Sequence, residues 1–196
     1  MAETSLSLLD RLREAPAEED WCLLVDIYTP LIHKWLGQFA SLPAADADDV
    51  TQEVLSVLVQ KVGSFLHSQR RGAFRHWLRS IAANCLKDHW RSKRRTPTAG
   101  DSQDLAAIEQ LADSTSELSR LWDAQHDQHI LRRLLAEIRP DFASSTWSAF
   151  EQLVLQNQSP QQVAANLGLS VNSVFIAKSR ILARLRQIGG GLLDDS

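Results

Sequence analysis

The sequence predicts an all-α protein of two small helical domains joined by an acidic linker, the second domain holding a helix-turn-helix. Apolar residues recur at a spacing of three to four through most of the 196 residues, and no segment alternates with a period of two over a useful length. Hydrophobic residues make up 44% of the chain, which is enough for packed cores. The expected division is 1–95 for the first domain, 96–120 for the linker and 121–196 for the second domain.

The first domain is predicted to begin with two helices. Apolar positions from Leu23 to Phe39 mark one buried helical face, which Pro30 should bend or interrupt. Asp46 is the expected N-cap of a second helix that continues to about Val62. A short loop then leads to the most regular helical pattern of the chain.

That third helix is predicted from an apolar stripe running from Phe74 to His89. Cys85 falls on the stripe, so it is interpreted as a small core residue. The opposite face holds polar and charged side chains: Arg75, Arg79, Asn84, Lys87, Asp88 and Arg91. Trp90 lies near the helix end among cations, which favours a surface position, whereas periodicity favours a core position for Phe74.

Residues 96–120 are polar, acidic and rich in Ser and Thr, with one weak apolar patch, and predict a linker with at most one short helix. The helix-turn-helix is then predicted from local signals. Ser159 can cap a helix whose first residue is a proline, Gly168 suits a tight turn of positive φ, and Ser170 can cap the next helix. Ala164 and Val174 supply the small and β-branched positions of the motif.

Charge is distributed in two basic islands. Residues 67–95 carry 9 basic side chains and one acidic side chain, and residues 171–186 carry 4 basic and no acidic ones, although the net charge of the chain is -3. Residues 1–66 and 96–130 are acidic. This asymmetry indicates a polyanion binder that also presents an acidic surface to another partner.

Several functional classes are disfavoured by the sequence. No apolar run is long enough to cross a membrane, and residues 1–20 lack the pattern of a signal peptide, so a soluble cytoplasmic protein without membrane insertion is expected. The cysteines, Cys22 and Cys85, suit a reducing compartment. No catalytic residue, metal site or cofactor is expected, because neither a ligand set nor a nucleophile motif is found around the cysteines and histidines.

Four stretches in order, YTPLIHKWL, DADDVTQEVL, GAFRHWLRSIAANCLKDHWRSKRR and SPQQVAANLGLSVNSVFIAKSRILARLR, resemble regions 2 and 4 of bacterial sigma factors of the extracytoplasmic-function group. The resemblance implies a non-enzymatic protein that binds core RNA polymerase and promoter DNA, as a single-stranded minus-10 element and a duplex minus-35 element, and directs promoter recognition, melting and transcription initiation. An anti-sigma factor is a further partner that the resemblance leaves open.

The resemblance also implies site residues. The helix that would bind the polymerase clamp contains Asp48, Asp49, Val50, Gln52 and Glu53. The minus-10 set is Gly72, Phe74, Asn84, Lys87, Asp88, Trp90 and Arg91. The minus-35 set is Ser173, Phe175, Lys178, Ser179, Arg180 and Arg184. Phe175 and Ala177 stand where the group usually has basic residues, so the promoter sequence cannot be transferred from a relative.

Three alternatives compete with this interpretation. A helix-turn-helix regulator with an N-terminal sensing domain explains residues 159–186 but not the basic, aromatic helix before the linker. An enzyme would need more than Cys85 with His89, or His126 with His129. A pure interaction protein such as an anti-sigma factor would not need two basic islands.

Overall fold

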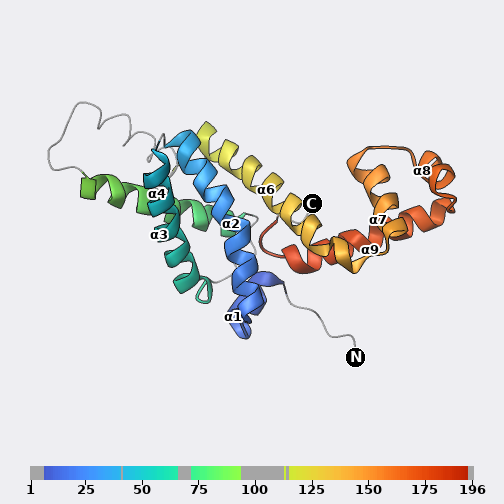
Figure 1. Cartoon of the computed structure of the whole chain (residues 1–196), viewed down its shortest axis with the longest axis horizontal. Helices are drawn as coiled ribbons and strands as arrows, with labels where there is room; N and C mark the ends of the chain where they lie inside the picture. Colours follow the sequence, from blue (N-terminus) through green and yellow to red (C-terminus); the bar gives the residue numbers. More distant parts are fainter. Residues whose placement is uncertain (1–6, 41, 66–71, 94–112, 114, 194–196) are drawn as a thin grey trace.

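The computed structural model describes residues 7–40, 42–65, 72–93, 113 and 115–193, and the regular structure in these ranges is helical apart from one isolated bridge between Gly190 and Leu193 (Figure 1). The predicted all-α fold is confirmed. The helices are α1 (Leu8–Glu14), α2 (Glu18–Phe39), α3 (Ala44–Val62), α4 (Ala73–Lys93), α6 (Glu117–Ile138), α7 (Ser144–Phe150), α8 (Pro160–Leu167) and α9 (Val171–Gly189). A 3-10 turn, η1 (Arg139–Asp141), precedes α7, and a π-helical segment, η2 (Glu151–Leu155), follows it.

Helix α2 is central to the first half of the chain, where it contacts α1, α3 and α6. Its buried side chains, among them Leu24, Ile27 and Leu31, recur at the predicted spacing. Of the two effects predicted for Pro30, the interruption is wrong, because α2 continues to Phe39, and the bend stays a prediction. Pro30 lies on the exposed side, where solvent can satisfy the carbonyl that loses its donor.

Helix α3 packs between α2 and α4. It begins at Ala44 with Pro43 at the N-cap, so the prediction of Asp46 as N-cap is wrong. Asp46 lies in the first turn, where the helix dipole favours an acid, and its carboxylate faces α4. Lys93 donates to Asp46, and His89 Nε2 lies 3.7 Å from the same carboxylate. The hydrogen bond from Lys93 lowers the pKa of Asp46, so this acid connects two helices instead of capping one.

Helix α6 packs on the helices that precede the predicted linker (Figure 1). The predicted linker lies outside the described residues at 96–112 and 114, and its end enters α6, whose N-cap is Ser116. The Trp122 ring meets Trp35 of α2 edge to face, with centroids 4.8 Å apart. His129 Nε2 lies 2.7 Å from the carbonyl oxygen of Ile27. The first turns of α6 therefore share a core with α2, and the division of the chain at residue 120 stays a prediction.

The last part of the chain, α7 to α9, forms a small helical unit of its own at one end of the molecule (Figure 1). Its separate core contains Ala149, Val163, Ala164, Val174 and Ala177. The C-terminal end of α9 returns to α6 and α1. A Cβ added at Gly189 would lie 2.8 Å from Leu134 Cδ1, and one at Gly190 would lie 3.1 Å from Ser7 Cβ. A side chain at position 189 would therefore require the Leu134 side chain to move.

None of the described helices has both the length and the apolar character that crossing a bilayer requires.

Candidate polymerase and nucleic-acid interfaces

One face of α4 carries four of the predicted minus-10 residues. Asn84, Lys87, Asp88 and Arg91 are all exposed, and their spacing of i, i+3, i+4 and i+7 places them on one side of the helix. Arg91 Nη1 donates to Asp88 Oδ1 at 3.0 Å, an exposed pair that competes little with a ligand. This face offers an amide, cations and a carboxylate for hydrogen bonds to bases and phosphates.

The other three predicted minus-10 residues differ from this group. Phe74 is fully buried and packs against Tyr28, Phe65 and Trp77, so it belongs to the core, as its periodicity indicates. Trp90 is half-buried and packs against the same core, which corrects its expected surface position. Gly72 has a φ of +70° immediately before α4. Their places in the minus-10 set stay predictions.

Arg75 and Arg79 lie on a different side of α4 from Asn84, which corrects the prediction that they share its polar face. They face α6. Arg75 Nη1 donates to Asp127 Oδ2 at 2.7 Å, and Arg79 Nη1 donates to Asp123 Oδ1 at 3.1 Å. Arg79 is only 2% exposed, and its burial lowers its pKa while Asp123 opposes that change. These two cations therefore hold α6 and are not part of an open basic surface.

His126 of α6 is completely buried. Its Nε2 lies 3.3 Å from the Tyr28 hydroxyl and its Nδ1 lies 3.1 Å from Asp127 Oδ1. A neutral ring that accepts from Tyr28 and donates from Nδ1 to Asp127 satisfies both contacts. Burial lowers the pKa of His126, although Asp127 opposes that change, so the ring is a neutral structural group.

The exposed face of α3 carries the predicted polymerase-binding side chains except one. Asp48, Asp49, Gln52 and Glu53 are exposed, and His33 of α2 lies 3.0 Å from the Asp48 carboxylate. Val50 is fully buried in the core. Its side chain offers no surface to a partner, which separates it from the other four.

The helix-turn-helix has the predicted local structure. Ser159 and Gln162 form a capping box at the start of α8, Gly168 ends α8 with a φ of +65°, and Ser170 Oγ accepts from Ser173 N at 3.0 Å at the start of α9. Ala164 and Val174 are buried between the two helices. The predicted caps, turn and packing positions are confirmed.

The six predicted minus-35 residues are in different environments on α9. Phe175, Ser179 and Arg180 are exposed, and Lys178 is half-buried. The Ser173 hydroxyl lies 2.8 Å from that of Ser170, within the cap. Arg184 Nε donates to Asp141 Oδ2 at 2.8 Å, so this guanidinium connects α9 to η1. The structure thus brings three of the six side chains to an open surface.

Comparison with known proteins bears on the segment from within α2 to the end of α4. Residues 24–96 match the Sigma-70 region 2 family. All the predicted polymerase-binding and minus-10 residues lie within this region 2 segment. A curated relative, the probable RNA polymerase sigma factor RfaY of Xanthomonas campestris pv. campestris, is 29% identical over 142 residues, which cover 72% of this chain and 34% of the relative. The chain thus spans about a third of the length of that relative. Both comparisons support a sigma factor.

Two exposed residues of α9 were missed by the sequence interpretation. Asn172 and Ile176 lie on the same outward side as Phe175 and Ser179, because the four positions follow a spacing of i, i+3, i+4 and i+7. The interpretation favoured cations and hydroxyls on this helix. A helical wheel centred opposite Val174 would have found both residues.

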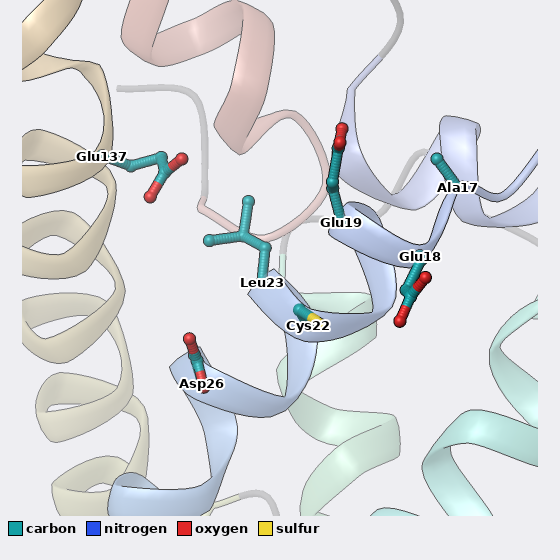
Figure 2. Close-up of a pocket in the computed structure, with 7 residues that line it drawn as sticks. All are labelled: Ala17, Glu18, Glu19, Cys22, Leu23, Asp26 and Glu137. Atoms are coloured by element: carbon teal, nitrogen blue, oxygen red, sulfur yellow. The ribbon is translucent and has the colours of Figure 1, made fainter.

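An open hollow of 460 Å³ lies between the start of α2 and the end of α6. Figure 2 shows Glu137 on α6 and the other lining residues on or just before α2, with Cys22 next to Leu23. Three more carboxylates line it: Glu18, Glu19 and Asp26. Among the described residues no group of histidine, cysteine and acidic side chains is arranged to hold a metal ion.

Cys85 lies on α4, away from this hollow. Burial raises the pKa of the Cys85 thiol to about 11, so it stays protonated near neutral pH.

Proposed function

We propose that this protein is a sigma factor of the extracytoplasmic-function group, which binds core RNA polymerase and directs promoter recognition, melting and initiation. The observation that carries the proposal is that one chain contains a region 2 segment with an exposed polar face on α4 and, beyond it, a capped helix-turn-helix. The protein acts by binding and catalyses no reaction itself. It works in the cytoplasm, where the polymerase and the chromosome are.

The polymerase clamp is proposed to bind the exposed face of α3. Asp49, Gln52 and Glu53 share this face, and no cation of α4 reaches them in the contacts of the described residues. Asp46, by contrast, is occupied by Lys93. An acidic surface of this kind favours a basic partner and increases the rate of association.

The exposed face of α4 is proposed to hold the melted minus-10 element. Asn84 can hydrogen-bond to the edge of an unstacked base, and Lys87 and Arg91 can neutralise its phosphates. Extruding a base costs a few kcal/mol, and each captured base returns about 1 to 3 kcal/mol. Base capture therefore offsets much of the cost of each extruded base, and phosphate contacts of the cations contribute to the remainder.

The helix-turn-helix is proposed to bind the duplex minus-35 element, with α9 in the major groove. Its four cations, Lys178, Arg180, Arg184 and Arg186, are accompanied by no acid in α9. Asn172, Phe175 and Ile176 are exposed in the first turns of α9, the part of a recognition helix that reaches base edges. Phosphate contacts would set its position and outward side chains its specificity.

The test is transcription in vitro with core polymerase and the full chain on a library of genomic fragments, followed by permanganate footprinting of the selected promoters. A sigma factor gives initiation and reactive thymines that are absent with core polymerase alone. A helix-turn-helix regulator with an N-terminal sensing domain binds duplex DNA but opens none. Duplex binding without any reactive thymine would reject the sigma factor in favour of that regulator. An anti-sigma partner is a separate proposal, tested by co-purification from cells.

A further inference from the structure

The outward side of α9 has an apolar centre. Phe175 and Ile176 are each 49% exposed, next to each other in sequence and in the first half of the helix. Asn172 and Ser179, also exposed, lie above and below them on the same side. No other pair of neighbouring large apolar side chains in a described α-helix is exposed to this extent.

Packing within the helical unit does not explain these two side chains. The core between α7, α8 and α9 is filled from α9 by Val174 and Ala177, which point to the other side of the helix. A single exposed apolar residue is ordinary, but an adjacent pair on the outward side of a helix-turn-helix lies where base edges are contacted.

The surroundings of the pair favour DNA as its ligand. Arg180 is exposed one turn further along, Arg186 follows on the exposed surface, and α9 carries no acidic residue. An apolar centre followed along the helix by cations complements the major groove, whose rims are phosphates and whose floor carries one apolar group, the C5-methyl of thymine.

We infer that Phe175 and Ile176 read thymine C5-methyl groups, so that the upstream element contains A·T pairs under the first two turns of α9. The inference rests on the proposed duplex binding by α9 and adds its base specificity. Asn172 is placed beside the pair, and its amide can accept from N6 and donate to N7 of the paired adenine.

The test uses replacement of thymine by deoxyuridine, which removes the methyl and leaves base pairing unchanged. A duplex is first selected from a randomised 30-base-pair library (about three helical turns) with polymerase holoenzyme containing the full chain. Each thymine of the upstream element is then replaced singly, and affinity is measured. At one or two positions the replacement should weaken binding about fourfold, the effect of one buried methylene-sized group.

The Phe175→Ala variant should lose this discrimination, with a thymine-to-uracil affinity ratio near one, whereas Phe175→Leu should keep part of it. Ile176→Ala should lose the discrimination between thymine and uracil at a neighbouring base pair. Leu131→Ala is the matched control, because it removes an exposed apolar side chain from α6 and should leave the ratio unchanged. Circular dichroism and thermal unfolding verify that each variant is folded.

The possible results separate the inference from the proposed function. Duplex binding with no sensitivity to any methyl overturns the inference and leaves the proposed function standing. Weaker binding of Phe175→Ala to core polymerase, with an unchanged thymine-to-uracil ratio, assigns the pair to a protein contact and also overturns the inference. A holoenzyme that selects no duplex overturns both.

Discussion

Arg79 of α4 and Asp123 of α6 are 44 residues apart in sequence, and their side chains meet with an Nη1 to Oδ1 distance of 3.1 Å. The Arg79 guanidinium is almost completely buried and also contacts the Ser119 carbonyl and the His76 ring. Such a buried cation needs its partners, because an unpaired charge in the interior is costly. The pair therefore holds α6 against α4 of the region 2 segment.

Asp123→Ala should lower the free energy of unfolding by about 1 to 3 kcal/mol, since it leaves the buried Arg79 without its carboxylate. The matched control is Asp88→Ala, which breaks the exposed pair with Arg91 and should cause no measurable change. Chemical denaturation of the full chain measures both. Equal stability of the two variants would contradict the assignment of Arg79 as a buried anchor of α6.

Acidification should destabilise the protein through His126. Burial holds its pKa in the folded state below the ordinary value of 6.5, so the unfolded chain binds the extra proton first. The contribution of neutral His126 to the free energy of unfolding is thus fully present above about pH 6.5, and it is lost as the pH falls from there through the depressed pKa. His129 shifts in the same direction. Denaturation between pH 7.5 and 5.5 should show a smaller dependence of stability on pH for His126→Gln than for the parent protein.

Two glycines give opposite expectations for alanine. Gly168 has a φ of +65°, so Gly168→Ala should destabilise the helix-turn-helix by about 1 to 2 kcal/mol through backbone strain alone, because nothing lies within 4 Å of the added Cβ. Gly63 has equal space but a φ of -62°, so Gly63→Ala should stabilise the protein by about 0.4 to 1 kcal/mol. Thermal unfolding measures both changes. A stabilised Gly168→Ala together with a destabilised Gly63→Ala would contradict the backbone conformations assigned to the two glycines.

The exposed face of α3 should decide affinity for core polymerase. The double variant Asp49→Lys and Glu53→Lys reverses two charges on this face and should weaken binding about tenfold without loss of helical content. The control is Asp26→Lys with Glu137→Lys, which makes the same charge change at the hollow between α2 and α6. Pull-down with core polymerase should give a lower affinity for the α3 double variant than for the control double variant. Wild-type affinity of the first variant would exclude this face as the clamp contact.

The exposed face of α4 should matter for melting and not for upstream binding. Asn84→Ala and Arg91→Ala are each expected to reduce open complexes on a duplex promoter, at a cost of about 1 to 3 kcal/mol for each base that the helix no longer holds. A template with a pre-opened bubble should restore part of the signal, because unstacking is already complete. Gln128→Ala on α6 removes an exposed amide elsewhere and serves as the control. A uniform loss on both templates would indicate a defect other than base capture.

Local signals in the sequence were sufficient for the helix-turn-helix. Ser159, Gly168 and Ser170 act within one turn of their own positions, and each has the predicted role. The prediction of Asp46 as an N-cap is wrong because the interaction of this residue is not local. Its carboxylate is engaged by Lys93, 47 residues away, and a distant partner of this kind leaves no mark on local spacing.

The candidate site residues show the same difference between local patterns, which the sequence reveals, and distant partners, which it does not. Periodicity identified the exposed group around Asn84, but it could not assign Arg75 and Arg79, whose partners come from a helix on the other side of the predicted linker. Val50 was grouped with its acidic neighbours although every turn of α3 must also bury one side. Ile176, which is exposed, is absent from the predicted minus-35 set although its neighbour Phe175 belongs to it.

The docking of α6 also determines a geometry. A helix of 22 residues is about 33 Å long, and α6 runs from the surface of the region 2 segment into η1, which leads to α7. The orientation of α9 relative to α4 is thereby set by helical phase. One residue inserted in the middle of α6 would turn the following helices by about 100° and advance them by about 1.5 Å. With the two DNA contacts proposed above, this arrangement should tolerate only a narrow range of separations, and of rotational offsets, between the minus-10 and minus-35 elements.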